Sequence, residues 1–191
     1  MVFRGKGDAC YSGVKRLFML ALLFGSLQGA TLERLSFDDL AAKSTAIVRG
    51  KVTDAWPAMT GGVIYTHYKI RVAETFKGTV QSSVEIMVPG GTLNGVQQTF
   101  AGSPTLNSGD DFVLFLWTSK SSGITWIMGL TQGLFNLSSD GTSDPAAVRP
   151  ASRELMLDAA TGKQVKDTAM NMRLSQLRSR IAASLSKAGA Q

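Results

Sequence analysis

AIVRGKVTDAWPAMTGGVIYTHYKIRVAETFKGTVQSSVEIMV, residues 46–88, decides the fold of this chain of 191 residues. Three apolar-rich segments, 46–52, 63–76 and 83–88, are separated by turns rich in Pro, Gly and Ser. The middle segment alternates between two faces, which is the pattern of a strand with one buried side. One face carries Ile64, Thr66, Tyr68, Ile70 and Val72, and the other carries Tyr65, His67, Lys69 and Arg71. Because this segment is about 14 residues long, we expect it to bend, as strands in a small barrel do.

Further strand-like segments continue as far as residue 137. Residues 96–100 form a short candidate strand in a glycine-rich region, and residues 125–128 and 133–137 form two more. The segment FVLFLW, residues 112–117, is apolar at every position, which indicates a strand covered on both faces. Residues 154–157 are one further candidate. These short strands and their regular turn signals predict a mainly β fold, with an all-β barrel and flanking helices.

A helix is predicted on each side of the strand-rich region. Ser36 suits the N-cap of the first helix, with Asp39 at the third helical position and Leu35 placed to pack on Leu40. The second predicted helix begins near residue 170. Its apolar residues recur at helical spacing with arginines between them: Met172, Leu174, Leu177, Ile181 and Leu185. This amphipathic pattern favours a helix docked on the barrel, and a basic helix on a membrane or partner surface is the alternative.

The first 30 residues have the pattern of a secretory signal peptide. Four basic residues precede the apolar run 17–27, and a stretch of small residues ends at Ala30. We therefore expect cleavage near Ala30 and a secreted or periplasmic product. The apolar run holds 11 residues, against the roughly 20 that span a bilayer, so no lasting membrane span is expected. The predicted organisation is a signal peptide (1–30), one barrel domain (31–137), and a linker with a C-terminal helical extension (138–191).

Charge and cysteine content limit the function classes. Removing residues 1–30 takes away 4 of the 20 basic and 1 of the 14 acidic residues, leaving 16 − 13 = +3, and residues 31–137 are neutral with 8 of each sign. No basic stripe marks a nucleic-acid interface, so nucleic acid is not an expected partner. Cys10 is the single cysteine and lies in the predicted signal peptide. The exported chain is therefore expected to have no disulfide, thiol nucleophile or cysteine-bound metal, and no cofactor is predicted.

Several segments together resemble the netrin-like domain that is shared with tissue inhibitors of metalloproteinases. They are the short helix, the strand IVRGKV (47–52), the long strand closed by FKG (76–78), VEIMVPGG (84–91) and GDDFVLFL (109–116). The resemblance covers about residues 35–137 and implies a five-stranded barrel of the oligonucleotide/oligosaccharide-binding (OB) type. The chain is also similar to secreted bacterial proteins that keep this barrel without its cysteines.

The resemblance also implies a mode of inhibition. In the animal inhibitors a mature N-terminal cysteine, held by disulfides, places its α-amine and carbonyl on the protease zinc. This chain departs from that pattern, because its predicted mature start is Thr31-Leu32-Glu33. The α-amine and carbonyl of Thr31 remain a possible zinc-binding pair, since main-chain atoms suffice for that chemistry. If inhibition holds, Thr31, Leu32 and Glu33 are expected to enter the protease cleft.

The residues offer little for catalysis. His67 is the only histidine, and no Gly-x-Ser-x-Gly motif presents a serine to it, so neither a triad nor a histidine-cluster metal site is predicted. Asp110 and Asp111 are adjacent and are expected to start a turn. A carboxylate-dependent hydrolase using Glu74 and Glu85 is the one enzymatic alternative, and it requires two acids at a suitable separation. We therefore expect no enzyme activity.

Binding is the expected function. Trp56, in a predicted loop before Pro57, is the best candidate contact residue, and Tyr65 and His67 lie on the polar face of the long strand. The leading hypothesis is a secreted, non-catalytic protein-interaction module, with metalloprotease inhibition as its sharpest form. The alternative is a module that binds glycans of the cell envelope, with Trp56 and Tyr65 as stacking platforms.

Overall fold

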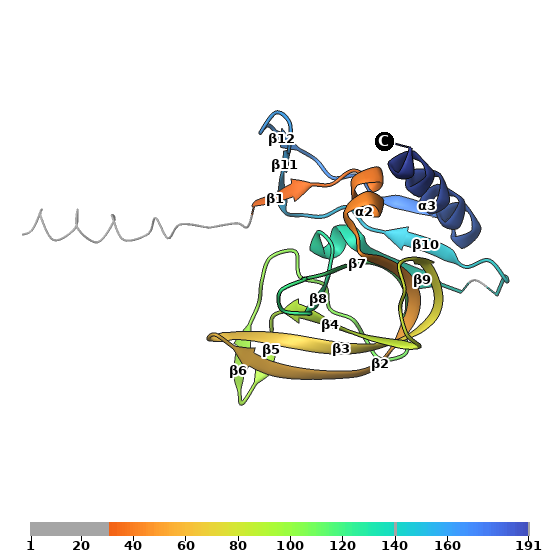
Figure 1. The fold of residues 1–191 in the computed structure, drawn as a ribbon. Helices are drawn as coiled ribbons and strands as arrows, with labels where there is room; N and C mark the ends of the chain where they lie inside the picture. Colours follow the sequence, from red (N-terminus) through yellow and green to blue (C-terminus); the bar gives the residue numbers. More distant parts are fainter. Residues whose placement is uncertain (1–30, 140, 191) are drawn as a thin grey trace, which may run out of the picture.

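The computed structural model describes residues 31–139 and 141–190, so the predicted signal peptide lies outside the described residues. This part of the chain is mainly β, with a short helix near its start and a longer helix at its end (Figure 1). That content was predicted from the sequence. No helix within the described ranges is both long and apolar enough to cross a bilayer.

The elements follow one another along the chain. The first half contains β1 (Thr31–Arg34), α2 (Phe37–Lys43), β2 (Ala46–Thr60), β3 (Val63–Lys77), β4 (Ser83–Pro89), β5 (Gly91–Leu93) and β6 (Val96–Gln98). The second half contains β7 (Asp111–Thr118), β8 (Thr125–Ile127), the 3₁₀ helix η2 (Leu130–Gly133), β9 (Leu134–Ser138), β10 (Ala146–Arg149), β11 (Leu155–Asp158), β12 (Gln164–Val165), β13 (Met170–Arg173) and α3 (Leu174–Gly189).

One antiparallel sheet dominates the fold. Its strand order is β13-β10-β9-β7-β2-β3-β4, and β8 pairs with the C-terminal end of β7. The long strands β2 and β3 curve strongly, and β8 comes beside β4 (Figure 1). No ladder of hydrogen bonds joins β8 to β4 in the described ranges, so the sheet is open and the expected closed barrel is not observed. Two smaller sheets, β1-β11-β12 and β5-β6, complete the structure.

The first long strand differs from the prediction. Residues 54–60 were expected in a loop, but β2 continues through Trp56 and Pro57 and pairs with β3 to its end. The reason is that β7 pairs only with residues 46–51, so the second half of β2 is a sheet edge. A proline is tolerated there because its missing N–H leaves no ladder bond unmade. One irregularity in the pairing of β2 with β3 lies at Gly50, where a Cβ atom would lie 2.6 Å from the carbonyl oxygen of Arg71.

The segment after residue 138 contributes more strands than expected. The candidate at 154–157 is β11, but β10 and β13 were not predicted, and residues 170–173 form a strand where the helix was expected to begin. Strand β10 pairs with β9 and β13 pairs with β10, so both extend the main sheet. The helix α3 begins only at Leu174.

The main sheet separates two apolar cores. Strand β7 contributes to both, because Phe112, Leu114 and Leu116 face the curved interior while Val113 and Phe115 face the helices. This confirms the prediction of a strand covered on both faces for residues 112–116, whereas Trp117 at the end of the predicted segment is 42% exposed. The interior core also contains Val48, Val52, Tyr68, Ile70, Ile86 and Ile127, and the helix-side core contains Phe37, Leu40, Ile47, Phe135, Leu174, Leu177 and Ile181. Each large apolar side chain buried in this way contributes roughly 1.5–3 kcal/mol.

Helix α2 is fixed at both ends. Its predicted capping box is confirmed: the Asp39 amide donates to Ser36 Oγ at 3.0 Å, and the Ser36 amide donates to Asp39 Oδ2 at 3.3 Å. At the other end, Lys77 Nζ donates to the carbonyls of Ala41 and Ala42 at 2.7 and 2.8 Å. Burial lowers the pKa of Lys77. A cation at this position complements the helix dipole, so β3 and α2 are held together.

Helix α3 is docked on the sheet, as the amphipathic pattern predicted. Asp144 accepts hydrogen bonds from the amide and hydroxyl of Ser175 at the start of the helix. Glu74 of β3 forms a bidentate ion pair with Arg178, with contacts of 2.8 and 2.7 Å. Near the end of the helix, Ser184 Oγ donates to Asp38. These hydroxyl donors lower the pKa values of Asp144 and Asp38.

Candidate functional site

The six predicted binding residues fall in two places. Trp56, Tyr65 and His67 lie together on the face of β2 and β3 that is opposite the interior core, because Ile64, Tyr68 and Ile70 of β3 are the buried ones. Thr31, Leu32 and Glu33 form β1, which belongs to the separate sheet with β11 and β12. The two groups therefore define two surfaces rather than one site.

Paired rings make up the first surface. Trp56 and His67 are cross-strand partners, and their rings stack with centroids 5.4 Å apart and planes 14° apart. His67 Nδ1 lies 2.8 Å from Glu85 Oε1 on the neighbouring strand β4. Tyr65 packs edge-on against Trp126 of β8, with centroids 5.6 Å apart. We call Trp56, Tyr65, His67 and Trp126 the outer aromatic cluster.

Part of this cluster could be foreseen from the sequence. The alternation of residues 63–76 places Tyr65 and His67 on one face, and an antiparallel partner strand brings Glu85 to the same face. Trp126 could not be assigned, because its position beside Tyr65 depends on how far the sheet curls. The ring of Trp56 is half-buried on a strand rather than exposed on a loop.

The second surface is built around β1. Thr31, Leu32 and Glu33 pair in parallel with residues Leu155, Met156 and Leu157 of β11. On the other edge of β1, the side chain of Gln132 makes two hydrogen bonds: Oε1 accepts from the Leu35 amide and Nε2 donates to the Glu33 carbonyl, both at 2.9 Å. Gln132 is 1% exposed. Its amide therefore makes the main-chain hydrogen bonds that a neighbouring strand would make, and it holds this edge of the segment.

A groove of about 380 Å³ lies beside β1. Its walls are Leu32, Glu33, Leu35, Lys43, Ile127, Met128, Gly129, Leu130 and Gln132. Leu130 has φ = 56°, in the left-handed region that bulky residues rarely adopt. Such strained residues cluster at functional sites, where the surrounding structure holds them. Sequence reasoning did not identify Leu130 or Gln132, because nothing in the segment LTQG, residues 130–133, indicates either the strained backbone at Leu130 or the two hydrogen bonds of Gln132.

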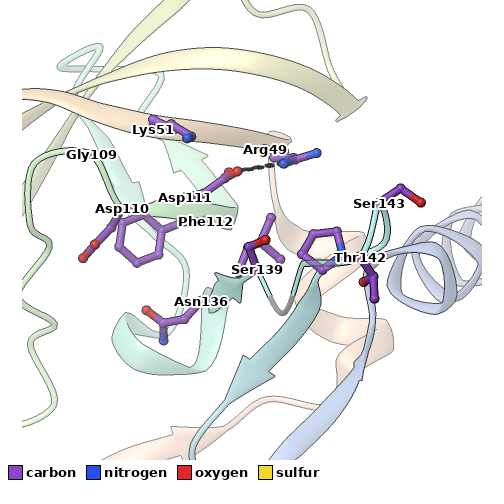
Figure 2. Close-up of a pocket in the computed structure, with 12 residues that line it drawn as sticks. Arg49, Lys51, Gly109, Asp110, Asp111, Phe112, Asn136, Ser139, Thr142 and Ser143 are labelled. Carbon is purple, nitrogen blue, oxygen red and sulfur yellow. Dashed lines mark hydrogen bonds and ion pairs between the residues drawn. The ribbon is translucent and has the colours of Figure 1, made fainter.

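Another cavity, with a volume of about 540 Å³, lies between the start of β7 and residues 136–139 and 142–145 (Figure 2). Asp111 points to Arg49, which donates to both carboxylate oxygens at 3.2 and 2.7 Å, and this pair raises the pKa of Arg49. Asp110 points away from that pair and accepts from Asn107 in the turn before β7. The turn interpretation therefore fits Asp110, whereas Asp111 is the first residue of β7 and its carboxylate pairs with Arg49.

The proposed catalytic acids are not brought together. Glu85 lies opposite Lys69 on β3, and Glu74 lies five residues further along that strand. At roughly 3.3 Å per residue, their backbones are about 16 Å apart, which exceeds the separation that glycoside hydrolysis uses. Each acid also has its own partner, Arg178 for Glu74 and His67 for Glu85. In residues 31–139 and 141–190, no three His, Cys, Asp or Glu side chains converge as a metal-binding group.

Comparison with models of protein families and with curated protein sequences gives no match for this chain. The function must therefore be argued from the site geometry.

Proposed function

We propose that this chain is an exported, non-catalytic binding module with an OB-like, netrin-like architecture, and that it recognises another protein through β1 and the groove beside it. The curvature of β2, β3, β4, β7 and β8 around one interior core supports the architecture. The partner class suggested by the resemblance is a zinc metalloprotease. Under this proposal the exported chain begins at Thr31.

The clamp by Gln132 is the observation that carries this proposal. A terminal strand with exposed residues ordinarily frays unless it is tied down. Here β11 holds one edge of β1 and the Gln132 amide holds the other. A segment that is ordered before binding avoids the entropy cost of ordering it in the complex. The amide clamp takes the place of the disulfides that the resemblance implies for the animal inhibitors.

The groove beside the clamp suits a protein partner. Leu32 of β1 and Leu35, Met128 and Leu130 provide apolar surface next to the exposed start of the strand. Glu33 and Lys43 form a salt bridge of 3.6 Å at its rim, where both side chains are about half exposed. An apolar centre with a polar rim is the usual anatomy of a protein interface.

The free N-terminus provides the test. Chain beginning at Thr31 is compared with chain carrying one additional alanine before Thr31, using hydrolysis of a fluorogenic peptide by a thermolysin-type zinc protease. Inhibition by the first form and its loss in the second are expected, because the added residue displaces the α-amine. An alanine added at the C-terminus is the matched control. Equal potency of all three forms would exclude insertion of the N-terminus, and affinity capture with the same three baits would then test β1 as an ordinary protein-binding edge.

A second candidate function is binding of an envelope glycan by the outer aromatic cluster. The observation that favours it is the pairing of Trp56 of β2 with His67 of β3, and of Tyr65 of β3 with Trp126 of β8, since aromatic faces stack on sugar rings. Alanine at Trp56 is expected to remove retention on immobilised envelope polysaccharide while leaving the unfolding midpoint within about 2 °C. If the unfolding midpoint falls together with glycan retention, Trp56 is a packing residue instead.

A further inference from the structure

A small cavity at the end of the interior core differs from the others in its chemistry. It has a volume of about 190 Å³ and lies between the inner face of β3, the turn from β4 to β5, strand β6 and residues 99–105. Its lining consists only of Thr, Ser, Tyr, Gln, Val, Pro, Phe and Gly residues. We propose that this cavity binds one neutral sugar unit. The inference does not depend on β1 or on the proposed protein partner.

The absence of charge in the lining selects the ligand class. None of these side chains is ionisable near neutral pH, whereas the groove beside β1, the cavity of Figure 2 and the cavity along β11 and β12 all carry charged side chains. An ionic ligand would lose its hydration here without gaining a counter-charge. A neutral ligand with hydroxyl groups has no such penalty, because hydroxyls both donate to and accept from Thr, Ser, Tyr and Gln side chains.

Several polar groups in the lining have unused hydrogen-bonding capacity. Ser103 Oγ is buried and has no partner among the described residues. Tyr68 is 5% exposed, and its hydroxyl accepts only a long bond of 3.4 Å from the Leu106 amide, which leaves its proton available. A buried hydroxyl without a partner is costly in free energy. A ligand hydroxyl would satisfy these groups.

Other residues fix the walls of the cavity. The Gln98 side chain accepts from the Ile64 amide at 2.7 Å and donates to the Gly62 carbonyl at 3.1 Å, which ties β6 to the turn between β2 and β3. Thr66 Oγ1 donates to the Gly90 carbonyl at 2.7 Å. Gly91 has φ = 141°, and a Cβ atom there would lie 2.5 Å from Thr66 Oγ1. The cavity is therefore formed before any ligand arrives, as in most small-molecule sites.

Size and surface both fit a single sugar ring. The volume corresponds to roughly six water molecules at about 30 Å³ each. Phe100 lines the cavity next to Gly90 and is 42% exposed, although it is a large apolar side chain. Its ring supplies apolar surface for the C–H side of a sugar, and the Thr and Ser side chains of the lining supply hydroxyl groups. These features distinguish the cavity from the outer aromatic cluster, which lies on the other face of β3.

Titration of the ¹⁵N-labelled protein with sugars, followed by NMR, tests the proposal. The neutral probes are glucose, galactose and N-acetylglucosamine, and glucuronate is the charged probe. We expect at least one neutral sugar to shift the amide resonances of Gly90, Gly91 and Ser103 saturably, with glucuronate at least about tenfold weaker. No saturable shift at about 100 mM, well above the millimolar range expected for so small a ligand, would overturn the proposal. Equal binding of glucuronate would do the same.

Three variants locate the site. Phe100→Ala is expected to weaken binding at least about tenfold, because it removes the apolar platform. Ser103→Ala is expected to weaken binding while the unfolding midpoint stays equal or rises, because the buried hydroxyl has no partner to lose. Leu155→Ala is the control, because its side chain is 41% exposed on β11 and lies outside the lining, and it is expected to leave sugar affinity unchanged. A fourth variant, Trp56→Ala, tests the outer aromatic cluster. Loss of binding in Trp56→Ala with full retention in Phe100→Ala and Ser103→Ala would place the sugar on that cluster and refute the cavity.

Discussion

Replacing Gln132 by methionine tests the clamp on β1. Methionine has a similar length but no amide, so the Leu35 amide and the Glu33 carbonyl both lose their partner. Both bonds are part-buried and Gln132 is 1% exposed, so water replaces the lost partner poorly. An unsatisfied buried group costs about 1–3 kcal/mol. Two of them predict a loss of about 2–6 kcal/mol in the free energy of unfolding, which corresponds to roughly 4–24 °C in Tm for a domain of this size.

Urea denaturation and hydrogen exchange measure this effect together. The Leu35 amide is expected to lose protection in Gln132→Met, whereas amides of the central strand β7 should follow only the global change. Gln98→Met is the matched control, because Gln98 also uses its side chain to bridge two main-chain groups, at the Ile64 amide and the Gly62 carbonyl. It should leave the Leu35 amide protected. A loss below about 0.5 kcal/mol with the Leu35 amide still protected would refute the clamp.

Three further outcomes are expected. Asp167→Ala should cost about 3–5 kcal/mol in urea denaturation, because Arg149 is left buried without its carboxylate; a loss below about 1 kcal/mol would contradict this. Gly50→Ala should destabilise the chain by about 1–3 kcal/mol in the same assay, since the new Cβ meets the Arg71 carbonyl, and unchanged stability would show that β2 relaxes at no cost. Acid should loosen helix α3, because the pKa values of Asp38 and Asp144 are lower in the folded state. Their contribution to stability is complete above the ordinary carboxyl pKa and is lost as pH falls from about 5 towards 2. A Leu177 amide that stays equally protected from hydrogen exchange across that range would contradict this expectation.

The parts of the fold that depend on local pattern could be predicted. The period of residues 63–76 defined β3 and its buried face, and the capping residues Ser36 and Asp39 defined the start of α2. The apolar run before Thr118 defined a strand covered on both sides. In each case neighbouring residues determine the geometry, so the signal lies within one short window of sequence.

The parts that depend on distant contacts could not be predicted. Strand β10 reads AAVR and β13 reads MNMR, and neither has a strand signal without the pairing of β10 with β9 and of β13 with β10. In sequence, Trp56 and Pro57 look like loop residues. They can lie in a strand because β7 does not pair with their half of β2, which is therefore a sheet edge. The closure of the sheet was also overestimated, since β8 reaches β4 without pairing with it.

The same distinction separates the residues of the candidate sites. Tyr65 and His67 were found because strand alternation gives their direction, and Thr31, Leu32 and Glu33 were chosen only from their place after the predicted cleavage point. Gln132 and Leu130 had no signal at all, although both line the groove beside β1 and Gln132 is hydrogen-bonded to Glu33 and Leu35. An amide that bonds two main-chain groups works only if the backbone presents an acceptor and a donor at its own spacing, which is a property of the folded chain. The chain has no cysteine after residue 30, so hydrogen bonds rather than a disulfide hold β1 at this point. Hydrogen bonds are reversible, and the order of β1 therefore depends on the packing of η2, which carries Gln132. A disulfide would hold the strand without that dependence.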